Sequence, residues 1–214
     1  MERTPQSKRA EHARHLRRQG EFIEAATFYA AAAHGWLLRS RPLPEEDVGN
    51  YSLSHFGYAM QDFSAATLCC RLGGEDEWGR KYCLTSINSI EILLNNNMDF
   101  SNQIEGPERG LFHELIGDFS LIGDIGNPME YYRNAETIYR DVDNPRQWQA
   151  ESEFHSAIQI ALELANSVEY ELSMEESQQI KFESLTKRIS FKKEKYPDII
   201  HMVLQDGNWD SDLI

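Results

Sequence analysis

The chain has 214 residues, of which 41% are hydrophobic and 26% are charged, and its formal net charge at pH 7 is −14. These fractions are ordinary for a globular protein and argue against wholesale disorder. The negative charge disfavours binding to nucleic acid or anionic lipid, except where basic residues gather in one segment. No stretch approaches the roughly 18 uninterrupted apolar residues of a membrane span, and no apolar signal region opens the chain. We therefore expect a cytoplasmic protein.

Helical signals run along the whole sequence, whereas alternating patterns and hairpin turns, the signals of strands, are nearly absent. Gly20 follows the first predicted helix, and Gly73 with Gly74 closes the fourth. Ser173 and Glu176 form a capping-box pattern at the start of the ninth. In chain order we predict helices over about residues 5–19, 21–39, 45–60, 62–72, 76–94, 107–122, 128–142, 145–170, 173–196 and 198–205, with a loop at 95–106.

The first two predicted helices carry a pattern of small and aromatic residues. The sequence RHLRRQGEFIEAATFYAAAAH places Leu16, Ala25, Tyr29 and Ala32 at fixed spacings around Gly20. A second copy has Phe112, Leu115, Phe119, Tyr132 and Ala135, and a degenerate third has Phe63, Ala66, Cys70 and Gly73. Ala135 follows Ala32 by 103 residues, close to three periods of a repeat of roughly 34 residues.

This pattern resembles the tetratricopeptide repeat, in which small residues let two antiparallel helices approach closely. The uneven spacing of the copies is more similar to the divergent solenoids of the soluble NSF attachment protein type. The resemblance implies an all-α, right-handed solenoid of antiparallel helix pairs with about nine to ten helices. We expect a single domain over residues 1–206 and an acidic C-terminal tail over 207–214. An irregular helical bundle is the alternative fold.

The sequence lacks the motifs of common enzymes. It has no P-loop, no GxGxxG and no GxSxG, and none of its seven histidines belongs to an HExxH or a Glu-x-x-His pair. His12 and His15 share a helix face without a third ligand nearby. The three cysteines, Cys69, Cys70 and Cys83, lack CxxC spacing, which fits buried thiols in a reducing compartment. We expect no catalytic residues, no metal and no cofactor.

Two segments are basic against the acidic background. Residues 1–19 hold six bases and two acids, and Lys8, Arg14, Arg17 and Arg18 all fall on the first predicted helix. The three arginines lie away from the stripe of Ala13 and Leu16, and the resemblance implies that this helix lines a concave groove. We predict these four residues as a partner-binding surface, with a solvated face as the alternative. The second segment, which contains Lys187, Arg188, Lys192, Lys193 and Lys195, is interpreted as cations at a helix C-terminus, with anionic lipid or an acidic protein as the alternative partner.

The leading functional hypothesis is a non-enzymatic scaffold or adaptor whose concave groove binds an acidic or amphipathic peptide segment. A nucleic-acid-associated regulator that uses the basic first helix is one alternative. An enzyme with a dispersed site is another. The partner is expected to be a protein or peptide, and the sequence leaves homo-oligomerisation open.

Overall fold

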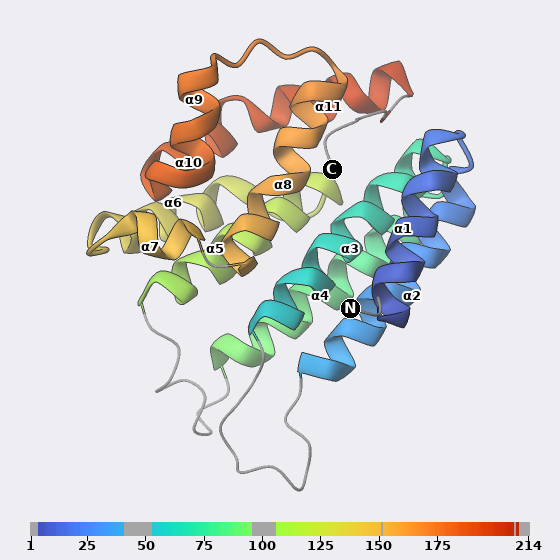
Figure 1. The fold of residues 1–214 in the computed structure, drawn as a ribbon, viewed down its shortest axis with the longest axis horizontal. Coiled ribbons are helices and arrows are strands. Elements are labelled where there is room, and N and C mark those ends of the chain that lie inside the picture. Colours follow the sequence, from blue (N-terminus) through green and yellow to red (C-terminus); the bar gives the residue numbers. More distant parts are fainter. Residues whose placement is uncertain (1–3, 41–52, 96–105, 151, 208, 210–214) are drawn as a thin grey trace, which may run out of the picture.

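The computed structural model describes residues 4–40, 53–95, 106–150, 152–207 and 209, and over these residues the fold is all-helical without strands, as predicted (Figure 1). All but the two end residues of the loop predicted at 95–106, and most of the predicted tail, lie outside the described residues. The helices are α1 (Pro5–Arg18), α2 (Phe22–Ser40), α3 (Leu53–Leu72), α4 (Asp76–Asn95), α5 (Gly106–Ile122), α6 (Pro128–Arg140), α7 (Pro145–Ala150), α8 (Ser152–Ser167), α9 (Met174–Gln178), the π-helix η1 (Gln179–Glu183), α10 (Leu185–Glu194) and α11 (Tyr196–Asp206).

Local sequence signals account for most helix ends. The Thr4 hydroxyl accepts a hydrogen bond from the Ser7 N–H at 3.2 Å and caps α1. Gly20 and Gly74 both adopt a φ of +80°, the left-handed conformation that glycine tolerates best, and they turn the chain between paired helices. The capping box of Ser173 and Glu176 is present at the start of α9.

One predicted helix break is wrong. Residues 53–72 form a single helix, α3, in place of one helix that ends near residue 60 and another that begins at Asp62. Aspartate is a common N-cap, but Asp62 lies in the middle of α3 with its side chain buried, and no glycine or proline interrupts the backbone at that point. The third repeat copy therefore lies within one helix, and its antiparallel partner is α4.

The C-terminal half contains more and shorter helices than its hydrophobic periodicity predicts. The range predicted as one helix over 145–170 contains α7 and α8, which are described on either side of residue 151, and the helix predicted over 173–196 is α9, η1 and α10. Ser184 is extended, and its hydroxyl caps α10 by accepting a hydrogen bond from the Lys187 N–H at 3.2 Å. Pro197 does not end a helix but lies in the first turn of α11, where proline is well tolerated.

Helices α1 to α6 form three hairpins, and each hairpin packs against the next through α2 with α3 and α4 with α5. Helix α8 lies across this assembly and packs on α3 and α5, while α11 packs on α8 (Figure 1). The repeat residues Ala32, Tyr132 and Ala135 have no exposed surface, as expected of close helix contacts. In the α5–α6 hairpin, Gly117 leaves space for the Tyr132 ring, since a Cβ atom at Gly117 would lie 2.5 Å from that ring.

A fully buried ionic network joins the C-terminal helices to this hairpin. Arg188 and Lys192 of α10 both pair with Glu114 of α5, with a distance of 2.6 Å from Lys192 Nζ to the Glu114 carboxylate. Lys192 also pairs with Asp118, and the Tyr132 hydroxyl donates to Asp118 at 2.9 Å. Arg188 and Lys192 have no exposed surface, so they are not solvated cations at a helix end as the sequence suggested.

The two carboxyl groups of the network have different electrostatic environments. Burial raises the pKa of Asp118 to about 6, because Lys192 offsets the desolvation only in part and Glu114 repels the second charge. Burial also opposes ionisation of Glu114, but Arg188 and Lys192 together keep its pKa below the ordinary value. Of the two carboxyl groups, Glu114 therefore stays ionised to lower pH than Asp118.

Adjacent lysines provide a matched test of this network. Lys192→Met should lower the free energy of unfolding by about 3 to 5 kcal/mol, because it leaves the buried Asp118 without its cation and Glu114 with Arg188 alone. Lys193 pairs with Glu136 at a partly exposed site, so Lys193→Met should cost less than about 1 kcal/mol. Urea denaturation followed by circular dichroism measures both values. Equal losses in the two variants would contradict the assigned geometry.

Candidate binding groove over helix α8

A cavity of about 580 Å³ lies between helices α1, α2 and α3 on one side and α8 with η1 on the other. This volume is in the range of small-ligand sites in proteins. Aromatic side chains from three parts of the chain form much of its wall, namely Tyr29, Trp36, Tyr58 and Trp209. Trp36 and Tyr58 lie next to each other, with ring centroids 5.3 Å apart.

A second cleft of about 350 Å³ lies between α8 and the segment that leads through α9 into η1. Its lining is mostly apolar and includes Leu162, Tyr170, Leu172, Met174 and Phe182. Met174 is 80% exposed and Phe182 is 47% exposed, so two large apolar side chains face solvent there. Gln159 and Lys181 line both the cavity and the cleft. We call the two together the α8 groove.

Asp62 is the most unusual polar residue of the cavity. Helix α3 carries it into the wall, where only 8% of its surface is exposed. It forms no ion pair with any residue in the described part of the chain. Burial raises the pKa of Asp62 to about 8, while Arg14 and the Trp36 side chain lower it by smaller amounts. The site therefore contains a carboxyl group whose charge is poorly compensated by the protein itself.

The four predicted partner-binding residues do not form one surface. Arg14 lines the cavity and acts on both Asp62 and Glu163 without an ion pair to either. Lys8 and Arg18 are exposed, and neither lines the cavity. Arg17 is only 3% exposed, in place of the groove-facing position that its spacing suggested. Of the four, only Arg14 faces the groove.

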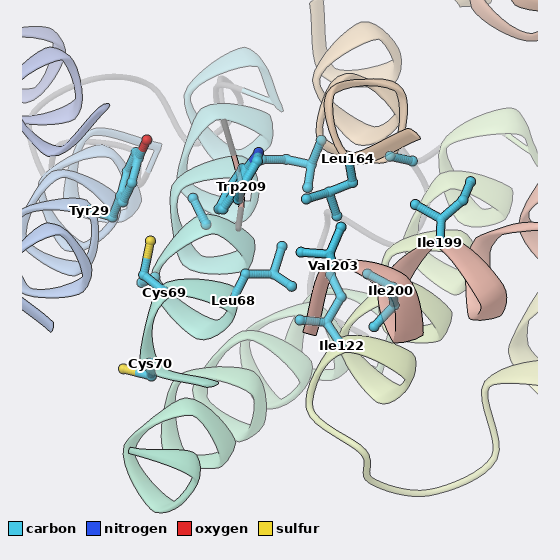
Figure 2. Close-up of a cluster of buried hydrophobic side chains, with 14 of the residues drawn as sticks. Tyr29, Leu68, Cys69, Cys70, Ile122, Leu164, Ile199, Ile200, Val203 and Trp209 are labelled. Carbon is cyan, nitrogen blue, oxygen red and sulfur yellow. The ribbon is translucent and has the colours of Figure 1, made fainter. Parts of the chain in front are cut away.

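Arg17 instead fastens the C-terminal residues to the core. Its guanidinium lies 4.0 Å from the centre of the Trp209 ring and 3.7 Å from the Glu163 carboxylate. Trp209 is 1% exposed and lies between Tyr29 and Leu164 in the core (Figure 2). Gly207, two residues earlier, has a φ of +63° and lets the chain turn back from α11. The segment predicted as a polar tail thus contributes a core residue that also forms a wall of the cavity.

The described cysteines and histidines form no second candidate site for catalysis or metal binding. Burial raises the pKa of Cys70 to about 11 and of Cys83 to about 12, and it raises that of Cys69 further, so these thiols are weak nucleophiles at neutral pH. Burial lowers the pKa of His155, which leaves this cavity residue neutral at pH 7. Across the described ranges, no three His, Cys, Asp or Glu side chains come together as a metal site.

The role of Trp209 can be tested against an exposed tryptophan. Trp209→Ala should lower the free energy of unfolding by about 3 to 5 kcal/mol, because it removes a large buried side chain. Trp78 is 53% exposed, so Trp78→Ala should cost less than about 1 kcal/mol. Thermal and urea unfolding would measure the difference. A Trp209→Ala protein as stable as the parent would show that the C-terminal residues are not part of the core.

Comparison with known proteins provides no relative from which a function could be inferred. No family model, no curated protein and no solved structure matches the chain. Among the described helices, none combines the length and apolar character that crossing a membrane requires.

Proposed function

We propose that the protein is a non-enzymatic interaction scaffold related in architecture to tetratricopeptide solenoids, and that the α8 groove binds an amphipathic peptide segment of a partner. In this proposal α1–α2, α3–α4 and α5–α6 are three repeat-like hairpins. Helix α8 covers the face on which α1, α3 and α5 lie and reduces it to a groove.

The adjacency of the cavity and the cleft is the observation that carries the proposal. The apolar cleft has two exposed large side chains, Met174 and Phe182, and it shares Gln159 and Lys181 with the cavity, whose walls are polar and aromatic. A compact small molecule would use one of these spaces. A segment of several residues with apolar and polar faces would use both, which is typical of helix or strand recognition in grooves.

The same contacts distinguish between the two peptide classes considered from the sequence. Arg17 is occupied by Glu163 and Trp209, and Arg14 is close to two carboxyl groups, Asp62 and Glu163. The charge of Arg17 is thus balanced within the protein, and the carboxyl groups near Arg14 disfavour a second acidic group there. An amphipathic segment is therefore favoured over one that is simply acidic.

Peptide selection tests the proposal and requires no identified partner. Peptides would be selected from a random displayed library on the folded protein, and their dissociation constants measured by fluorescence polarisation. In the double variant Met174→Ser, Phe182→Ser, binding should weaken at least about tenfold, because apolar anchors dominate such interfaces.

The matched control is Leu84→Ser, Ile92→Ser, which removes two other large apolar side chains, 50% and 58% exposed, from α4. Circular dichroism would check that both variants fold. Selected peptides that bind the α4 variant weakly and the groove variant normally would place the interface elsewhere. Failure to select any binding peptide would contradict the proposed function.

A further inference from the structure

We infer that the segment recognised by the α8 groove is basic, and that one of its ammonium or guanidinium groups pairs with Asp62 inside the cavity. The inference rests on the proposed function and specifies the charge of the ligand. It reverses the preference for an acidic partner that the arginines of α1 suggested.

Asp62 supplies the first reason. The residue is 8% exposed, lines the cavity and forms no ion pair with any described residue, although the Trp36 side chain hydrogen-bonds to it. A lone buried carboxylate is unfavourable, and a cation brought by a ligand would remove that penalty. The aromatic rings of Trp36 and Tyr58 flank the same space, and their faces favour a cation with an alkyl stem.

The charges around Asp62 define how strong this preference is. Arg14 of α1 and Lys181 of η1 are the two cations of the cavity, and Glu163 of α8 is its second carboxylate. Tyr29 of α2, Tyr58 of α3 and His155 of α8 complete the titratable lining. Tyr29 and His155 are neutral at pH 7, because burial raises the pKa of Tyr29 and lowers that of His155. Since Arg17 compensates Glu163, Arg14 is the main competitor of a ligand cation for Asp62.

The acidic segment from residue 169 to 175 supplies the second reason. Glu169, Glu171 and Glu175 are exposed, and they lie in sequence beside the cleft residues Tyr170, Leu172 and Met174. None of the three glutamates forms an ion pair with a lysine or arginine of the described ranges. Their charge outweighs that of Lys181, which lines the cleft, and it favours the approach of a helix with one apolar and one basic face. The net charge of −14 acts in the same direction at long range.

Two synthetic amphipathic helices of about five turns provide the probes. Both carry the same leucine and phenylalanine face, and the polar face is lysine with glutamine in the first and glutamate with glutamine in the second. At about 0.15 M salt the lysine peptide should bind the parent at least about tenfold tighter than the glutamate peptide. At about pH 9, where Asp62 is ionised, the Asp62→Asn variant should bind the lysine peptide at least about tenfold more weakly than the parent, whereas Glu130→Gln, on the exposed face of α6, should bind it as the parent does.

The pH dependence provides an independent readout. Between about pH 7 and 9 the lysine peptide should bind the parent more tightly as the pH rises, because Asp62 loses its proton while the peptide lysines keep theirs. The Asp62→Asn variant carries an amide that has no proton to lose in this range, so it should lack this rise. Asparagine matches the aspartate in shape and carries no buried charge, so the variant is expected to fold.

The outcomes separate the two claims. If the glutamate peptide binds as tightly as the lysine peptide, and both lose affinity in Met174→Ser, Phe182→Ser, the groove stands and its basic preference is wrong. If the preference for lysine survives in both Asp62→Asn and the groove variant, it reflects nonspecific attraction to an acidic protein and overturns the inference. If neither peptide binds, the basic amphipathic ligand class is excluded.

Discussion

The arrangement of the molecule depends on two cations that lie without solvent contact between α10 and the α5–α6 hairpin. Arg188 and Lys192 reach Glu114 and Asp118 on one side, and on the other they donate to the carbonyl oxygens of Phe154 and Ala157 at 2.9 and 3.0 Å. The same side chains thus fix α10 to α5 and α8 to α10. Because α8 forms one side of both the cavity and the cleft, the shape of the α8 groove depends on this network.

We expect the network to contribute to the specificity of helix packing more than to net stability. Replacing buried ion pairs by apolar residues is often neutral or stabilising, but removing one partner is costly. Glu114 and Asp118 are four residues apart on α5, as Arg188 and Lys192 are on α10, so the two pairs match in only one register of the helices. A shift of one turn would leave a buried charge without a partner. This constraint accounts for the burial of Arg188 and Lys192, two of the 21 lysines and arginines of the chain.

Local and long-range features differed in how well the sequence predicted them. The ends of α1, α2, α4 and α5 follow from glycine, proline and capping residues, which act within a few positions of the backbone. Asp62 was predicted to begin a helix because aspartate is a common N-cap residue. Arg17 was predicted to be exposed because most arginines lie at the surface. The burial of both residues is decided by α8 and Trp209, which lie about 100 to 190 residues away in sequence. The groove and the network depend on such distant contacts, so no local pattern could reveal them. The boundary between η1 and α10 was predictable, since Ser184 is a capping residue within the ninth predicted helix.

The buried network and Trp209 imply that the helices after residue 145 form one cooperative unit with α1 to α6. Native-state hydrogen exchange tests this cooperativity directly, since it reports the free energy of opening for each backbone amide. We expect the slowest amides of α8 and α10 to exchange with the same free energy as those of α3 and α5, equal to the global value from urea denaturation. Exchange of α8 and α10 at a clearly lower free energy, with α3 and α5 still protected, would show that α8 opens on its own and that the two parts are not one cooperative unit.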